Sequence, residues 1–169
     1  MISHIRKATH GDRALRNTQP FIRELAGRTH VFAHNGELKG IEQANDLSLG
    51  RYQPVGDTDS ELAFCNLLER LTPLWGEAAD VAPSLEARLN LIADFAADLR
   101  PFGPANFLYA DSDVLFVHAD RPSQPGGEIQ PPGCTYCNEV VVWQRRKWSM
   151  RVWPWFSSNR ISHWSPVCP

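Results

Sequence analysis

The sequence contains few cysteines, no long apolar run and no strong excess of one charge. It has 169 residues, of which 43% are hydrophobic and 21% charged, with a formal net charge of −2. No apolar run approaches the roughly 20 residues that cross a bilayer, and the N-terminus does not resemble a signal peptide. The four cysteines are too unevenly placed for the disulfide framework of a secreted protein. We therefore expect a globular cytoplasmic protein.

Residues 138–169 differ in composition from the rest of the chain. They contain five of the 17 basic side chains, one of the 19 acidic ones and five of the six tryptophans. Basic residues interleaved with aromatics can bind nucleic acid or anionic membranes, but three adjacent charges at 145–147 form a weak signal. We expect neither partner here. A frameshift or a wrongly assigned reading frame explains the change in composition better.

Two of the cysteines, Cys134 and Cys137, have the spacing of a zinc-binding pair. A structural zinc site needs four ligands, and only His163 and Cys168 lie nearby in the sequence, without a second close pair. A redox role is also disfavoured, because no βαβ pattern precedes the pair. We expect no metal and no cofactor.

Two helices are predicted from capping residues and apolar stripes. Thr58 and Glu61 fit the capping box, in which each side chain satisfies an otherwise unpaired backbone donor. Apolar residues then recur at i, i+3, i+4 and i+7 over 64–71, and Pro73 is expected to end the helix. A similar stripe predicts a second helix over 84–99.

Strand patterns flank these helices. A loop is predicted at 17–20, and residues 29–33 form a β-branched and aromatic run that stops at the Asn-Gly turn signal of 35–36. Residues 106–110 and 114–118 are predicted to pair as a hairpin around a short polar turn. Strands followed by helices and then a hairpin indicate an α+β fold.

Three polar clusters lie at the ends of predicted elements, where functional residues are often found. They are RKATHG at 6–11, HNG at 34–36 and GDTDSE at 56–61. Taken singly, each has a structural explanation as a surface ion pair, a turn or a helix cap. Their order and spacing together are much less expected by chance.

As a set, the clusters resemble the glutaminase domain of class II glutamine amidotransferases, the N-terminal-nucleophile (Ntn) type, and most of all its small stand-alone members. The resemblance is strongest over 1–64 and extends to residue 133. It implies an α+β, Ntn-hydrolase-like four-layer αββα sandwich with its N-terminal strands missing. We expect a partial amidotransferase domain over 1–133 and a divergent, poorly packed tail over 134–169.

The resemblance implies that the chain binds glutamine through both charged ends of the amino acid. Arg6 matches the arginine that holds the α-carboxylate, a role that suits its planar fork of donors. Thr9 and His10 match neighbours that contact the same end. Asp59 matches the carboxylate that binds the α-ammonium. We expect Arg6, Asn35, Gly36 and Asp59 to converge on one pocket.

In this family a cysteine thiolate attacks the side-chain amide of glutamine, ammonia leaves, and water releases glutamate from the thioester. Asn35 and Gly36 match the oxyanion hole, whose donors are a side-chain amide and a backbone N–H. The family uses cysteine at the first position of the mature chain, whereas this sequence starts with Met1. Cys65 lies inside a predicted helix, where buried packing is the usual role of a free cysteine. We therefore expect a truncated, inactive chain.

Three functions remain open from the sequence. The chain is a glutaminase domain, a non-catalytic module that binds glutamine or a related amino acid, or the non-functional product of a gene fragment. The sequence does not reveal which protein, if any, accepts the ammonia.

Overall fold

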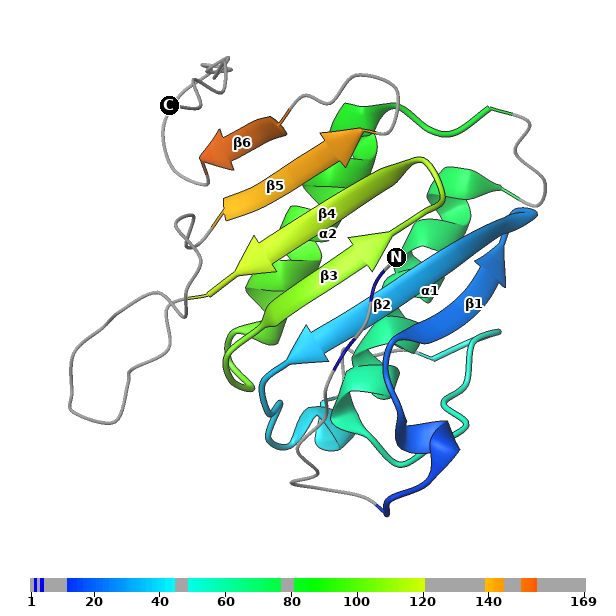
Figure 1. The fold of residues 1–169 in the computed structure, drawn as a ribbon, viewed down its shortest axis with the longest axis vertical. Coiled ribbons are helices and arrows are strands. Elements are labelled where there is room, and N and C mark those ends of the chain that lie inside the picture. The colour runs from blue at the N-terminus through cyan, green and yellow to red at the C-terminus, as the bar shows by residue number, and fades with distance from the viewer. Residues whose placement is uncertain are drawn as a thin grey trace.

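The computed structural model describes residues 2, 4, 12–44, 49–76 and 81–120, together with the backbone of two strands within 139–154. An antiparallel sheet of six strands packs against two helices (Figure 1). The strands are β1 (Phe21–Leu25), β2 (Arg28–Asn35), β3 (Asn106–Ala110), β4 (Val114–Ala119), β5 (Glu139–Gln144) and β6 (Met150–Pro154). The helices are α1 (Asp59–Trp75) and α2 (Leu85–Leu99), with short 3-10 turns η1 (Leu15–Asn17) and η2 (Ile41–Gln43).

The sheet keeps the order of the chain, since each strand pairs antiparallel with the next. The connection from β2 to β3 contains both helices, which lie together behind the sheet in Figure 1. The predicted α+β class is confirmed. Of the four layers of the expected sandwich, the described residues form two, one sheet and one helical layer.

The hairpin of β1 and β2 contains a strand that the sequence pattern did not indicate. Its two-residue turn places Ala26 and Gly27 at positive φ, of 53° and 72°, as the right-handed twist of paired strands requires. Strand β1 lacks a clear apolar alternation in its sequence, because the inward-facing position 23 is occupied by a charged residue. Arg23 turns toward the helices and forms an ion pair with the buried Glu61. The predicted strand at 29–33 and hairpin at 106–118 are both confirmed.

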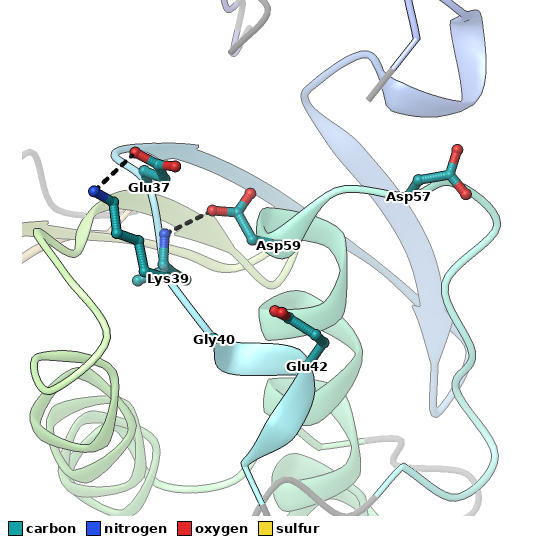
Figure 2. Close-up of a pocket in the computed structure, with 7 residues that line it drawn as sticks. Glu37, Lys39, Gly40, Glu42, Asp57 and Asp59 are labelled. Carbon is teal, nitrogen blue, oxygen red and sulfur yellow. Dashed lines mark hydrogen bonds and ion pairs between the residues drawn. The ribbon is translucent and has the colours of Figure 1, made fainter. Parts of the chain in front are cut away.

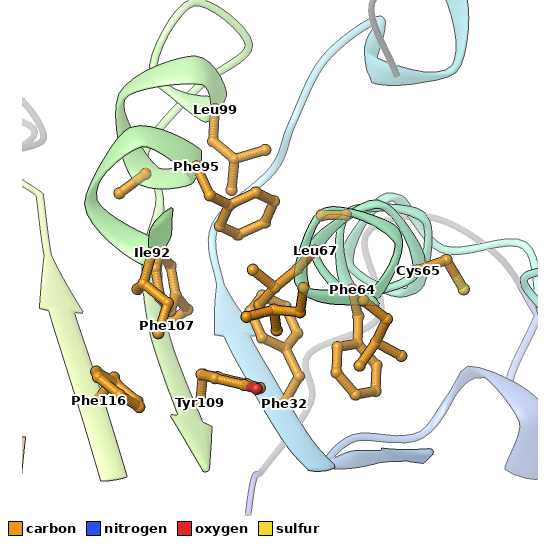
Figure 3. Packing of buried hydrophobic residues seen from close by; sticks show 14 of the residues in the cluster. Phe32, Phe64, Cys65, Leu67, Ile92, Phe95, Leu99, Phe107, Tyr109 and Phe116 are labelled. Atoms are coloured by element: carbon orange, nitrogen blue, oxygen red, sulfur yellow. The ribbon is translucent and has the colours of Figure 1, made fainter. Parts of the chain in front are cut away.

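The core is organised around Phe32 of β2, which is completely buried between the sheet and the helices (Figure 3). Its ring centroid lies 5.3 Å from that of Phe64 in α1. The rings of Phe95 in α2 and Phe107 in β3 lie at 6.5 and 5.5 Å. Burial of one such side chain stabilises the fold by about 1.5–3 kcal/mol. This packing fixes the start of α1 relative to the end of β2.

Helix α1 begins where the sequence predicts and ends later. The Thr58 hydroxyl accepts a hydrogen bond from the Glu61 N–H at 3.2 Å, so the N-cap is confirmed. The expected end at Pro73 is wrong, because the helix continues to Trp75. Proline removes one backbone donor near the end of the helix, while Trp75 buries a large ring against His30, 5.2 Å away. The gain from that burial explains the two additional helical residues.

The predicted division at residue 133 falls outside the described residues and stays a prediction. Beyond it, β5 pairs with β4, and β6 pairs with β5, so residues 139–144 and 150–154 contribute backbone to the same sheet. Within the described parts of the chain, no helix combines the length and apolar character that crossing a bilayer requires.

A buried ion pair joins α2 to the turn between β3 and β4. Arg88 donates to Asp111 at 2.7 Å, and these side chains are 4% and 0% exposed. The same guanidinium contacts Asp113 at 3.1 Å, but that carboxylate is 36% exposed. Asp111 also accepts the N–H of Val114 at 2.9 Å. The turn and the helix therefore depend on one buried carboxylate.

We predict that Asp111→Ala lowers the free energy of unfolding by about 3–5 kcal/mol, because it leaves the Arg88 charge buried beside an empty position. Asp113→Ala removes a partly solvated partner and should cost about 1 kcal/mol or less. Urea denaturation of both variants measures the difference. Equal losses of stability would contradict the asymmetry between the two carboxylates.

Candidate functional site

Two of the three sequence clusters meet where β2 ends and α1 begins. Asp59 is the first residue of α1, and its Oδ2 accepts the backbone N–H of Leu38 at 2.7 Å. Leu38 follows Gly36 by two residues, so this hydrogen bond joins the HNG cluster to the GDTDSE cluster. Arg6, Thr9 and His10 lie outside the described residues, and their convergence on this place stays a prediction.

Gly36 has a backbone conformation that excludes any side chain. Its φ is +153°, and a Cβ placed there would lie 2.1 Å from the carbonyl oxygen of Pro104. Asn35 ends β2 and is exposed; its carbonyl oxygen accepts a hydrogen bond from the Asn106 side chain at 3.3 Å. The segment at 35–36 is therefore held against 104–106 while it remains accessible to a ligand. The sequence predicts a tight turn after the strand. The structure shows that the glycine is needed there because the backbone of Gly36 approaches the backbone of Pro104 closely.

Asp59 keeps acceptor capacity for a ligand. Besides the Leu38 N–H, it accepts the N–H of Ser60 at 2.7 Å through Oδ1, and the Ser60 hydroxyl lies 3.2 Å from the same oxygen. A carboxylate has about four lone-pair sites, and the side chain is only partly buried. Its position at the start of α1 places the negative charge beside the positive end of the helix dipole. The remaining acceptor sites suit a cationic group.

Asp59 lines a pocket of about 480 Å³ beside η2. Figure 2 shows its side chain between the segment of Glu37 and Lys39, on one side, and the loop of Asp57, on the other. Four of the seven lining residues are acidic, and the single lysine lies 3.9 Å from Glu37. The pocket therefore favours cations. Its full lining is Glu37, Leu38, Lys39, Gly40, Glu42, Asp57 and Asp59.

Glu61 anchors the loop that leads into α1. The capping box predicts that its carboxylate returns to the N-cap backbone, but it accepts the N–H groups of Val55 and Gly56 instead, at 3.1 and 2.7 Å. It is 1% exposed, and its charge is balanced by Arg23. The sequence identified the residue and its helix but not these partners. Glu61 thus fixes the path of the chain just before Asp59.

Two side chains in the loop at 17–20 position the site, and sequence reasoning missed both. The buried Asn17 donates to the carbonyl of Asp12 at 3.1 Å and accepts the N–H of Asp57 at 2.9 Å. Gln19 accepts the backbone N–H of His34 at 2.5 Å. The loop that follows the RKATHG cluster therefore contacts both other clusters. Local sequence gives no signal for such contacts, because their partners are distant in the chain.

His34 is a further residue whose contacts were not predicted. It is 2% exposed, with Nδ1 at 2.9 Å from the Ser60 hydroxyl and Nε2 at 3.2 Å from the Pro104 carbonyl. Burial lowers the pKa of His34 below its ordinary value, although the Pro104 carbonyl and Asp59 both act to raise it. The ring is therefore neutral at pH 7.

No group of three or more histidine, cysteine, aspartate or glutamate side chains with metal-binding geometry occurs among the described residues. Cys65 is completely buried in α1, and burial raises the pKa of its thiol to about 11. The site as described consists of a glycine turn, a partly buried carboxylate and an acidic pocket.

Comparison with known proteins places the chain in one protein family. Residues 1–125 match the family model described as class II glutamine amidotransferases. The Escherichia coli protein named "Putative glutamine amidotransferase YafJ" is 43% identical over 118 residues, which are 70% of this chain and 44% of that protein. The chain spans less than half the length of the curated relatives it matches.

Solved structures agree with the sequence relatives. A crystal structure from Pseudomonas aeruginosa, titled as a predicted glutamine amidotransferase, covers 77% of this chain and 63% of its own at 29% identity, with a TM-score of 0.55. The glutamine phosphoribosylpyrophosphate amidotransferase of Bacillus subtilis covers 94% of this chain and 35% of its own, with a TM-score of 0.57. At 18% identity, the second likeness establishes the fold alone. These neighbours have the Ntn-hydrolase fold.

The anchoring role of Glu61 can be tested through stability. Glu61→Gln removes the charge that balances Arg23 and one of the charge-assisted contacts to the loop, so it should destabilise the protein by about 2–3 kcal/mol. Hydrogen exchange of the Val55 and Gly56 amides should also accelerate. Asp57→Asn, which disturbs only an exposed ion pair with Arg16, should cost less than about 1 kcal/mol and serves as the control. Unchanged exchange in Glu61→Gln would exclude the anchor.

Proposed function

Because the chain belongs to the class II glutamine amidotransferases, we propose that it binds free glutamine and forms the site at which the side-chain amide is hydrolysed to glutamate and ammonia. The observation that supports this function best is the hydrogen bond between Leu38 and Asp59. It brings the carboxylate expected to bind the substrate within two residues of the glycine expected to stabilise the oxyanion.

Asp59 is proposed to bind the α-ammonium of glutamine. Its remaining lone pairs and the acidic side chains around it make the pocket attractive to a cation. The two backbone N–H groups that it already binds, from Leu38 and Ser60, hold the carboxylate in one orientation. A fixed acceptor loses little conformational entropy on binding.

Arg6 is proposed to bind the α-carboxylate, with Thr9 and His10 contacting the same end of the substrate. Guanidinium and carboxylate groups form paired, charge-assisted hydrogen bonds. The loop contacts of Asn17 and Gln19 support this arrangement indirectly, because the segment that follows the RKATHG cluster is tied to both other clusters.

Asn35 and Gly36 are proposed to form the oxyanion hole. When a thiolate attacks the amide carbon, the carbonyl oxygen gains negative charge, and two N–H donors can stabilise it. One such donor contributes about 3 kcal/mol to transition-state stabilisation. Because a Cβ does not fit at Gly36, this residue has no side chain of its own that could cover its N–H. Collapse of the intermediate releases ammonia, and water then cleaves the thioester to give glutamate.

The second candidate is a module that binds glutamine without hydrolysing it. Hydrolysis needs an accessible thiolate, and Cys65 is a poor source of one, because its thiol is buried and its pKa is raised to about 11. Both candidates share the binding site and differ only in turnover.

Cys65 is therefore predicted to be dispensable for the chemistry. The polypeptide of residues 1–169 and its Cys65→Ser variant should bind glutamine equally and should release glutamate at the same rate, because the thiol is buried and its pKa is raised to about 11. A coupled glutamate assay at pH 8 measures release. Glutamate production by the wild type that Cys65→Ser abolishes would contradict the prediction.

Asp59→Asn is predicted to weaken glutamine binding about tenfold or more, since loss of a charge-assisted contact costs about 1.5–3 kcal/mol. Asparagine can still accept the Leu38 N–H, so the fold should persist. Calorimetric titration of glutamine measures the affinity, with Asp98→Asn as a charge-matched control in an exposed pair with Arg70.

A ligand control separates the charge effect from a general loss of shape. Glutaramate has the same chain and amide as glutamine but no α-ammonium. It should bind wild type and Asp59→Asn with similar weak affinity. Equal binding of glutamine to both proteins would refute the assigned role of Asp59, and absence of glutamine binding by folded wild type would refute the proposed function.

A further inference from the structure

His34, Ser60 and Asp59 form a continuous polar chain from β2 to the start of α1. His34 Nδ1 lies 2.9 Å from the Ser60 hydroxyl, which lies 3.2 Å from Asp59 Oδ1. We infer that His34 is a positioning residue that accepts the proton of the Ser60 hydroxyl, so that this hydroxyl does not donate to Asp59 and the second lone pair of Oδ1 stays available to the substrate ammonium. This inference rests on the proposed glutamine site.

The direction of each hydrogen bond follows from the partners of His34. The Pro104 carbonyl can only accept, so Nε2 of His34 must carry the proton that is donated to it, over 3.2 Å. Because burial keeps the ring neutral, Nδ1 then has a lone pair and no proton. The Ser60 hydroxyl therefore donates to Nδ1. A serine hydroxyl has one proton, so it cannot donate to Asp59 at the same time.

The consequence for Asp59 is an unoccupied acceptor position. In the native arrangement Oδ1 accepts the Ser60 backbone N–H at 2.7 Å, and Oδ2 accepts the N–H of Leu38. If the imidazole were absent, the Ser60 hydroxyl would rotate and donate to Oδ1 at its present separation. That bond would compete with an incoming ammonium. The histidine thus controls the acceptor capacity of Asp59 without touching the substrate.

The same ring also borders the glycine of the proposed oxyanion hole. A Cβ built on Gly36 would lie 3.0 Å from Nε2 of His34. The ring itself stacks on Phe32, with centroids 6.5 Å apart and planes at 14°. His34 therefore links both halves of the site to the aromatic core, which holds the imidazole in place.

The test is a double-mutant cycle on glutamine affinity, measured by calorimetry with the full chain. His34→Phe keeps the ring packing and frees the Ser60 hydroxyl, so the Kd for glutamine should rise about fivefold or more. Adding Ser60→Ala to that variant removes the competing hydroxyl and should recover most of the lost affinity, with Ser60→Ala alone closing the cycle. His30 is another buried histidine of the same strand. The variant His30→Phe is therefore the control for loss of a core imidazole, and it should leave the Kd for glutamine unchanged.

Each result of the cycle is decisive. If the double variant binds glutamine no better than His34→Phe, His34 has only a structural role and the inference is wrong. If folded wild type does not bind glutamine, the proposed function and this inference are both overturned. If wild type binds, Asp59→Asn does not, and His34→Phe binds normally, only the inference is overturned.

A second measurement needs no substitution. Long-range ¹H–¹⁵N NMR correlations of the histidine rings report which nitrogen carries the proton. At pH 8 we expect His34 to be the neutral tautomer protonated at Nε2. A ring protonated at Nδ1 would direct the Ser60 hydroxyl toward Asp59 in the native protein and would overturn the inference, whatever the binding data show.

Discussion

The hydrogen bond from the Leu38 N–H to Asp59 is the contact on which the arrangement of the site depends. It joins the loop after β2 to the first turn of α1, two segments that are 21 residues apart in the chain. Stacking of Phe32 on Phe64 brings these elements together, but apolar packing has no strong direction. The charged acceptor at the helix N-terminus supplies the direction, because a carboxylate accepts N–H groups in defined positions. The register between glycine turn and helix follows from that bond.

Buried charges stabilise the surroundings in the same way. Glu61 receives two backbone N–H groups and Arg23, and Asp111 receives Arg88 and a turn N–H. Burying a carboxylate is costly unless hydrogen bonds compensate, so each one constrains the chain around it. The two buried carboxylates constrain different parts of the chain. Asp111 closes a turn far along the sheet, whereas Glu61 fixes the loop from which Asp59 emerges.

The elements predicted best were those specified by neighbours in the sequence. The Thr58 cap, the apolar stripes of both helices and the hairpin of β3 and β4 depend on contacts within a few residues, and the structure confirms them. The misses have long-range causes. Strand β1 was not predicted because the charged Arg23 interrupts its apolar pattern, and the Glu61 carboxylate that pairs with Arg23 is 38 residues away. The helix continues past Pro73 because Trp75 is buried there.

In the candidate site, too, local motifs were predicted from the sequence and long-range contacts were not. Asn35, Gly36 and Asp59 belong to compact clusters in the sequence, and the order of these motifs is enough to predict them as site residues, a role that stays a prediction. The residues that hold them, Asn17, Gln19 and His34, act across 15 to 70 positions. Neither an asparagine in a loop nor a histidine at a strand end has a local sequence pattern that predicts contacts with distant residues of the site. Only the folded chain shows the partners that give each of them one.

The position of Asp59 also constrains which form of glutamine the proposed site accepts. A glutamine residue inside a polypeptide has a neutral amide where free glutamine has its α-ammonium. Binding such a residue would remove water from a partly buried carboxylate without supplying a counter-charge, at a cost of several kcal/mol. Free glutamine supplies that charge and three donors at once. Discrimination against peptide-bound glutamine therefore requires no steric barrier, because the unpaired carboxylate itself disfavours the wrong substrate.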